Sequence, residues 1–128
     1  MDNQDANKIL SDDLLNLIQI GVIKKDVQVL NNLKVTFISL NGNEEAEVFK
    51  QMKDVDNTNA TYRFDLYKKY VLAYSIKKVN DKELDINSRI NLIFNLQSNI
   101  ISSIWEEYTK NILGEQTNIL EELKKKSW

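Results

Sequence analysis

The chain has 128 residues, of which 42% are hydrophobic and 28% are charged, and its formal net charge is −2. These values are typical of one soluble globular domain, predicted to span residues 1–128, and the weak acidity gives no electrostatic footprint for nucleic acid. The chain has neither cysteine nor histidine, which removes disulfides, thiolate chemistry and the commonest general base and metal ligand. No apolar run approaches the ~20 residues that span a bilayer. We therefore expect no enzyme activity, no cofactor, no metal site and no membrane or nucleic-acid partner.

The first predicted elements are a polar, flexible N-terminus over residues 1–8 and a short helix in SDDLLNLIQIG. Ser11 can cap the free N–H groups of the first turn of this helix. Gly21 is placed to end the helix in the left-handed conformation.

A two-residue period follows in DVQVLNNLKVTFISL and predicts a β-hairpin. Asn31 and Asn32 tolerate positive φ and suit its tight turn. Val35 and Phe37 would lie on one face of the second strand. Because an isolated hairpin is marginally stable, we expect it to pack on helices or to add to the strands of a partner. Residues 9–42 are thus predicted to be a helix plus a hairpin.

Residues 43–128 are predicted to be helical. Asn43 is a plausible N-cap of the first helix of this part. The stretch TYRFDLYKKYVLAYSIKKV, residues 61–79, has apolar side chains at helical spacing and predicts a long helix. NDKEL, residues 80–84, is predicted to be a turn.

Two more helices are predicted after this turn. Asp85 or Asn87 would open the first, and the second would run from about Ile100 to the lysines 124–126, which suit the negative end of a helix dipole. Gly114 costs a helix ~1 kcal/mol relative to alanine, so this helix is expected to kink or split there. The expected fold class is mainly α with a small β-hairpin (α+β): a short N-terminal helix and hairpin followed by about four helices.

The search for chemical motifs gives carboxylate pairs and a tyrosine-rich helix. Adjacent carboxylates such as Glu106 and Glu107 diverge by about 100° on a helix and do not converge on a substrate. Packing with polar tips at the surface is the simpler interpretation of the tyrosines, and a protein interface is the alternative. These tyrosines are Tyr62, Tyr67, Tyr70 and Tyr74.

The order of elements carries more information than any single motif. DVQVLNNLKVTFISLNGNEEAEVFK gives strand, tight turn, strand and an acidic helix start. A long helix, YRFDLYKKYVLAYSIKKV, then leads through NDKEL into the helix with Arg89, NSRINLIFNLQSNIISSIWEEYTKNI. From about Asp26 to Lys126 the chain resembles the tail assembly chaperones of tailed bacteriophages and the related small assembly proteins of contractile-tail phages.

This resemblance implies a non-enzymatic assembly factor of the host cytoplasm. Such a protein binds the long tape measure protein and keeps it soluble until tail tube subunits polymerise around it. The expected partners are therefore phage tape measure or tail proteins, and a homo-oligomer is a further expectation. The expected partner-binding residues are Tyr62, Tyr67, Tyr70, Tyr74, Val35 and Phe37.

Other functions remain open at this point. A structural virion or baseplate component could use the same helix and hairpin contacts, and it would be found in the virion. A small regulatory or inhibitor protein is a further alternative.

Overall fold

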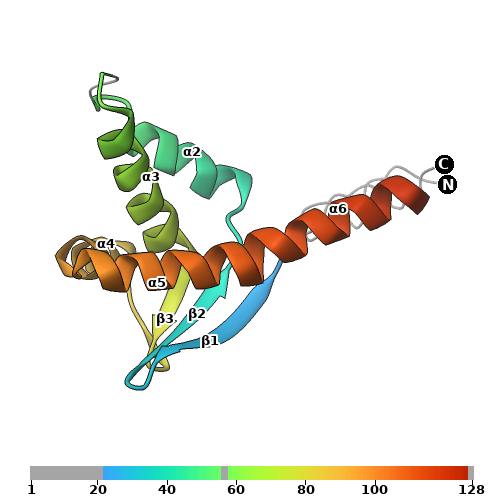
Figure 1. The fold of residues 1–128 in the computed structure, drawn as a ribbon, viewed down its shortest axis with the longest axis horizontal. Helices are drawn as coiled ribbons and strands as arrows, with labels where there is room; N and C mark the ends of the chain where they lie inside the picture. Colours follow the sequence, from blue (N-terminus) through green and yellow to red (C-terminus); the bar gives the residue numbers. More distant parts are fainter. Residues whose placement is uncertain (1–21, 56–57, 127–128) are drawn as a thin grey trace, which may run out of the picture.

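The structure, a computed structural model, describes residues 22–55 and 58–126. The predicted flexible residues 1–8 and the predicted helix before Gly21 lie outside the described residues. Figure 1 shows the described elements in chain order. They are β1 (Lys24–Leu30), β2 (Leu33–Ile38), α2 (Gly42–Gln51), α3 (Ala60–Ser75), β3 (Ile76–Val79), β4 (Lys82–Glu83), α4 (Ile86–Asn95), α5 (Ser98–Tyr108), the π-helical segment η1 (Thr109–Leu113) and α6 (Gly114–Lys126).

The α+β class predicted from the sequence is confirmed, but the β part is larger than one hairpin. Its strands form a four-stranded antiparallel sheet in the order β1-β2-β3-β4. The helices α2 and α3 are inserted between the neighbouring strands β2 and β3. Since α5, η1 and α6 follow one another without a break, about four helices follow the first hairpin in the described part, as predicted.

The first hairpin forms where the sequence placed it. β1 and β2 flank Asn31 and Asn32, and their register pairs Val27 with Val35. The strands that extend this hairpin come from the same chain, because β2 pairs on its other side with β3.

The predicted helix over residues 61–79 is too long, because its last residues form β3. Helix α3 ends at Ser75, and Val79 pairs with Val35 of β2. Asn80 and Asp81 then adopt positive φ angles of 50° and 67°, the left-handed region that tight hairpin turns require. The segment predicted to be helix end and turn is therefore a second β-hairpin, β3–β4.

The two hairpin turns lie against each other and are joined by hydrogen bonds in which Asn80 both donates and accepts. The Lys34 backbone N–H donates to Asn80 Oδ1 over 2.9 Å, and the Asn80 backbone N–H donates to the Lys34 carbonyl over 2.8 Å. Asn80 Nδ2 also donates to the Asn32 carbonyl over 3.1 Å. One side chain thus ties together turns that are distant in the sequence.

The starts of α2, α3 and α4 follow the capping rules, with one change of residue from the prediction. Asn41, and not the predicted Asn43, caps α2: its side chain accepts from the Glu44 N–H, and the Glu44 carboxylate accepts from the Asn41 N–H. Asn59 caps α3. Asp85, one of the two predicted candidates, caps α4, and the hydrogen bonds from Ser88 lower the pKa of its carboxyl.

The sequence predicted a kink or a split at Gly114, and the helix does not split there. Instead, Thr109–Leu113 form a π-helical segment, and Gly114 continues into α6. Figure 1 shows α5, η1 and α6 as one long rod that crosses the sheet and extends beyond it.

One face of the sheet and the inner faces of the helices enclose the hydrophobic core. Phe37 of β2 packs edge-on against Tyr108 of α5, with ring centroids 5.7 Å apart. The opposite face of the sheet is polar, and there the Thr36 hydroxyl donates to the Asp26 carboxylate over 2.6 Å. Buried core side chains come from both layers: Val35, Phe37, Val48, Val71, Leu72, Ile76, Ile93, Ile101, Ile104, Tyr108 and Ile112.

Candidate partner-binding surface

The two hairpin residues expected to bind a partner lie inside the molecule. Val35 is 1% exposed and Phe37 is 0% exposed. Both lie on the face of β2 that the helices cover, so a partner cannot reach either of them in this structure. This corrects the prediction for the hairpin: its apolar face is part of the core.

The four tyrosines of α3 lie in different environments. Tyr62 is 53% exposed in the first turn of the helix. Tyr70 and Tyr74 are half-buried, and the Tyr70 ring packs against Phe94 of α4 at a centroid distance of 5.0 Å. These two tyrosines therefore belong mainly to the packing between α3 and the rest of the fold.

Tyr67 is the tyrosine that lies in a cluster of other aromatic side chains. Its ring centroid is 6.5 Å from Phe49 of α2 and 6.5 Å from Phe64 of α3. Phe64 in turn meets Trp105 of α5 edge-on at 6.3 Å, and Trp105 lies 5.3 Å from Tyr108. The cluster thus connects three helices and reaches the core through Tyr108.

Two hollows lie between α2 and α3 around this cluster. The larger has a volume of about 270 Å³ and the smaller about 190 Å³, and both are lined by Phe49 and Tyr67. We call the larger one the aromatic groove. It is lined by Phe49, Met52, Ala60, Arg63, Phe64 and Tyr67.

Two residues in the wall of the aromatic groove are phenylalanines with exposed side chains. Phe49 is 63% exposed and Phe64 is 53% exposed, and Tyr62 is close by in the sequence. Neighbouring exposed aromatic side chains of this kind are typical of protein interaction sites.

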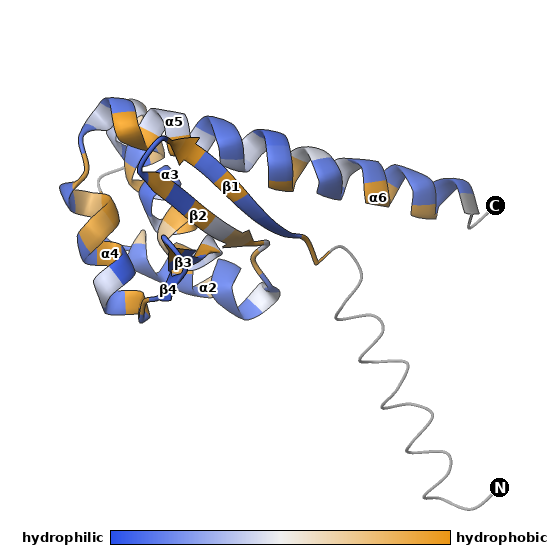
Figure 2. Ribbon diagram, turned by 90° about the horizontal axis from the view of Figure 1, so that it is seen from below, coloured by the Kyte–Doolittle hydropathy of each residue, from blue (hydrophilic) through white to orange (hydrophobic). Residues whose placement is uncertain are grey.

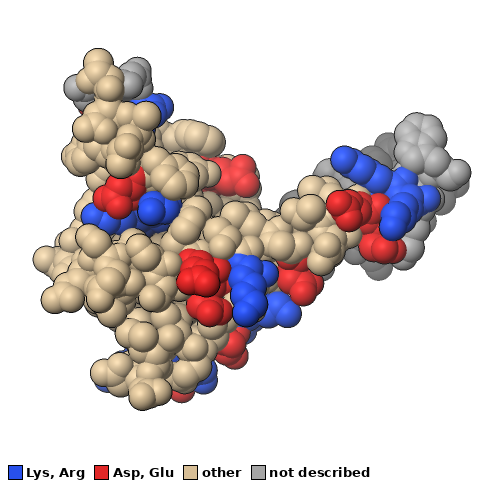
Figure 3. Space-filling view, in the orientation of Figure 1, with Lys and Arg blue, Asp and Glu red and all other residues tan. Residues whose placement is uncertain are grey.

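The charges at the groove are mixed. Arg63 contributes to the lining, and Lys68 Nζ lies 5.2 Å from the Phe64 ring centroid, a cation–π distance. Glu45 lines the adjacent smaller hollow. In Figure 3 the outer end of α3 is largely uncharged on the face shown. The groove is therefore an apolar surface with cationic and anionic groups at its rim.

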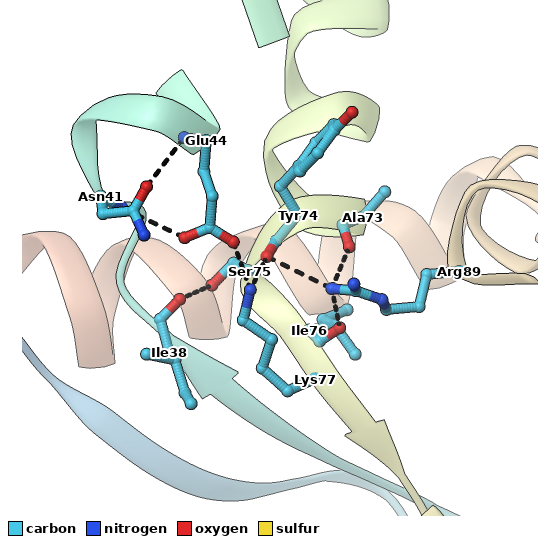
Figure 4. Close-up of polar contacts among 9 residues, drawn as sticks. All are labelled: Ile38, Asn41, Glu44, Ala73, Tyr74, Ser75, Ile76, Lys77 and Arg89. Atoms are coloured by element: carbon cyan, nitrogen blue, oxygen red, sulfur yellow. Dashed lines mark hydrogen bonds and ion pairs between the residues drawn. The ribbon is translucent and has the colours of Figure 1, made fainter. Parts of the chain in front are cut away.

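The end of α3 opposite the groove is fixed by polar contacts (Figure 4). Arg89 Nη1 of α4 donates to the carbonyls of Ala73 and Ile76 over 3.0 Å each, and to that of Tyr74 over 3.4 Å. A guanidinium is favourable there because the carbonyls at a helix C-terminus carry partial negative charge.

A second cation at the same helix end connects α3 to α2. Lys77 Nζ donates to the Tyr74 carbonyl over 2.7 Å and forms an ion pair with the Glu44 carboxylate. Glu44 is also the capping-box residue of α2, so this contact fixes the start of α2 beside the end of α3. The two helices that form the groove are thus tied together at their other ends.

Tyr108 marks the border between the aromatic cluster and the core. Burial raises the pKa of its hydroxyl to about 12, with smaller contributions from Tyr67 and from the nearby carboxylates Glu45 and Glu44. The phenol is therefore neutral at ordinary pH and acts as a packing residue with a polar tip.

Within residues 22–55 and 58–126, no cluster of three or more His, Cys, Asp or Glu side chains is arranged to hold a metal ion. None of the helices in that part of the chain is both long enough and apolar enough to cross a membrane. The chemistry offered by the groove is apolar contact with a few charges, which suits binding of a peptide or protein surface.

Sequence reasoning identified Tyr62 and Tyr67 but missed the other aromatic members of the surface. Phe64 and Tyr67 are three residues apart on α3 and share a helix face, a spacing that the sequence contains. Phe49 and Trp105 join them only because α2 and α5 pack beside α3. No local pattern could have found those two.

The fold and this surface define a small α+β protein with an apolar groove between two helices. Comparison of the chain with known protein families, with curated proteins and with solved structures finds no match.

Proposed function

We propose that this protein is a non-enzymatic tail assembly chaperone of a tailed phage, and that the aromatic groove binds helices of the tape measure protein. The observation that carries the proposal is the pair of exposed phenylalanines, Phe49 and Phe64, beside a hollow of about 270 Å³. The resemblance in element order supplies the class of client.

An amphipathic client helix suits this groove physically. Such a helix presents apolar side chains at i, i+3 or i+4 and i+7, and it binds by inserting a few of them between aromatic walls. Tyr67 at the base and Phe49 and Phe64 at the rim would make the main contacts. Arg63 and Lys68 would attract acidic residues on the client helix.

Several copies along one long client would add avidity to a weak single contact. The chaperone would act in the host cytoplasm, before tail tube subunits polymerise around the client. The chaperone must then leave the client, so its contacts in the groove would need to be reversible.

The test is co-expression of this chain with the tape measure protein of the same phage, with the soluble fraction of the client as readout. The double variant Phe49→Ala/Phe64→Ala should weaken client binding about tenfold or more, because exposed aromatic anchors carry most of the energy of such contacts. Leu30→Ala is the matched control, since Leu30 is an exposed apolar residue of β1, outside the groove.

Equal client solubility with the double variant and with Leu30→Ala would contradict the groove assignment. Mass spectrometry of purified particles separates the chaperone from a structural tail component. A chaperone is absent from finished particles, whereas a tail component is present in fixed copy number.

A further inference from the structure

The two hollows between α2 and α3 are neighbours that differ in chemistry. Both are lined by Phe49 and Tyr67, whose ring centroids are 6.5 Å apart. The aromatic groove lies on the Met52 side of this pair of rings, and the smaller hollow, of about 190 Å³, lies on the Glu45 side. We call the smaller one the acidic hollow. It is lined by Leu40, Glu45, Val48, Phe49, Tyr67 and Val71.

The acidic hollow combines one carboxylate with apolar and aromatic walls. Glu45 is the charged residue among the described residues that line it. Most positions of α2 are hydrophilic (Figure 2), and its apolar Val48 and Phe49 line the hollow beside Glu45. Because Glu45 and Phe49 are four residues apart on a helix, the carboxylate and the ring lie on the same side of α2. A carboxylate therefore stands at the edge of an aromatic site.

The charge of Glu45 is not neutralised by a neighbouring cation. Its carboxylate forms no ion pair within the described part of the chain. Glu44 differs, because Lys77 Nζ pairs with it and the two charges cancel (Figure 4). Lys68 Nζ lies over the Phe64 ring, which belongs to the aromatic groove. The N-terminus of α2 adds about half a positive charge, which offsets only part of the Glu45 charge. The acidic hollow is therefore net negative.

The Glu45 charge also acts on the interior of the molecule beside the hollow. Burial raises the pKa of the Tyr108 hydroxyl to about 12, and Tyr67, Glu45 and Glu44 add to this shift. A carboxylate influences a buried phenol in this way because the protein interior screens charge less than water does. The same field that keeps the Tyr108 hydroxyl protonated would stabilise a cation in the hollow.

A basic side chain suits these walls better than an apolar one. The ammonium of lysine or the guanidinium of arginine is attracted by aromatic ring faces and pairs with a carboxylate. The apolar stem of either side chain can lie against Val48 and Val71. A neutral apolar side chain in the same place would remove water from the Glu45 carboxylate without giving it a partner, which costs free energy.

We propose that the acidic hollow binds a lysine or arginine side chain of the client helix, about one helical turn from the apolar side chain that enters the aromatic groove. This inference rests on the proposed function, because it takes the occupant to be a client helix. On α2 the acidic hollow is lined from Glu45 to Phe49 and the aromatic groove from Phe49 to Met52. The offset of about four residues corresponds to about 6 Å, the rise between positions i and i+4 of a helix.

The first test titrates the full chain with n-butylammonium, which has the end group of a lysine side chain. Binding is followed by NMR of the methyl groups of Leu40, Val48 and Val71, which line the acidic hollow. Glu45→Gln should weaken binding about threefold or more, because it removes the charge and keeps the shape. The matched control Glu47→Gln makes the same change at an exposed position of α2 outside the lining, and it should leave binding unchanged. The neutral probe 1-butanol should bind more weakly than n-butylammonium.

The second test uses the tape measure protein in the co-expression assay. Glu45→Gln should lower the soluble fraction of this client, because the basic side chain of the client loses its partner. Glu47→Gln should leave the soluble fraction unchanged. The loss with Glu45→Gln should be smaller than that with Phe49→Ala/Phe64→Ala, since aromatic anchors carry more of the binding energy. Circular dichroism verifies that the variants keep their helix content.

The outcomes separate this inference from the proposed function. Equal binding of n-butylammonium to Glu45→Gln and to the original chain, or equal binding of n-butylammonium and 1-butanol, overturns the cation site. Equal client solubility with Glu45→Gln and Glu47→Gln overturns the client as the source of the cation. In each of these cases the proposed function stands if Phe49→Ala/Phe64→Ala still lowers client solubility. No effect of that double variant, with n-butylammonium bound through Glu45, overturns the proposed function and with it the client as occupant.

Discussion

The two halves of α3 differ in what surrounds them. The C-terminal half buries Val71, Leu72, Ala73 and Ser75, and its last carbonyls accept hydrogen bonds from Arg89 and Lys77. The N-terminal half contains no buried residue and ends beside the aromatic groove. The same helix is thus fixed at one end and exposes apolar surface at the other. We expect changes in the first half to affect folding and changes in the second to affect binding.

The strongest test of this difference removes a side chain from the buried half. Leu72→Ala should lower the free energy of unfolding by about 2–5 kcal/mol, because Leu72 is 0% exposed and its loss leaves a cavity. Urea unfolding followed by circular dichroism measures the change. A loss below about 1 kcal/mol would show that this half of the helix is less tightly packed than its burial indicates.

The second test uses pH to probe Tyr108 of α5, which lies at the border between the aromatic cluster and the core. Burial raises the pKa of Tyr108 to about 12, whereas an unfolded tyrosine titrates near 10. Between these pH values the tyrosine of the unfolded state loses its proton while that of the folded state keeps it. The contribution of the neutral, buried Tyr108 to the free energy of unfolding is therefore complete below pH 10 and is lost as the pH rises to 12. The expected loss is about 2–3 kcal/mol, from 1.36 kcal/mol per pKa unit.

Tyr108→Phe is the control for this pH dependence, because phenylalanine keeps the ring and has no titrating hydroxyl. The variant should show a flatter fall in stability between pH 10 and 12 than the original chain. Identical slopes for the two proteins would mean that the Tyr108 hydroxyl is in contact with water.

The third test removes the cation at the fixed end of α3. Arg89→Met should cost about 1.5–3 kcal/mol, the range for hydrogen bonds to a charged group, since the carbonyls of Ala73 and Ile76 lose their donor. Arg89→Lys should recover part of this loss because it keeps the positive charge. Lys50→Met, at an exposed position of α2, is the control and should change stability by no more than about 0.5 kcal/mol.

The smallest expected effect on stability lies in the groove. Phe64→Ala should change the free energy of unfolding by less than about 1 kcal/mol, because Phe64 is 53% exposed. The same variant should clearly reduce client binding in the co-expression assay. A large loss of stability without a change in binding would reverse the roles assigned to the two halves of α3.

Sequence reasoning located most elements that depend on neighbouring residues. The Asn31-Asn32 turn and the Asp85 cap follow from the local chemistry of asparagine and aspartate. The turn was predicted, and Asp85 was one of the two residues, with Asn87, predicted to open α4. The sequence also contained the signal that Asn41, and not Asn43, caps α2, because Glu44 is three residues after Asn41 and completes a capping box.

The second hairpin was missed because its strand continues the helical spacing of α3. Ile76 and Val79 fit the apolar face of a helix equally well, so periodicity alone could not mark the end at Ser75. What ends the helix is distant in the sequence: pairing with β2 and the contacts of Arg89. Asn80-Asp81 was the available local signal, since it has the same turn chemistry as Asn31-Asn32.

The candidate site was only partly predictable for a related reason. The tyrosines could be read from α3 alone, but which of them face a groove depends on where α2, α4 and α5 lie. Val35 and Phe37 were assigned to a surface because the sequence showed one hairpin, and a single hairpin has no interior. The four-stranded sheet and its helices supply that interior.

The insertion of α2 and α3 between neighbouring strands has a consequence for the order of folding. The hairpins β1–β2 and β3–β4 each close over a two-residue turn, and such hairpins form in about 1–10 μs. Joining them requires closing a much longer loop, because the hydrogen bond from Lys34 to Asn80 links residues 46 apart in sequence. Closing that loop costs conformational entropy before any β2–β3 contact forms. We therefore expect the central β2–β3 ladder to be the last part of the sheet to assemble during refolding.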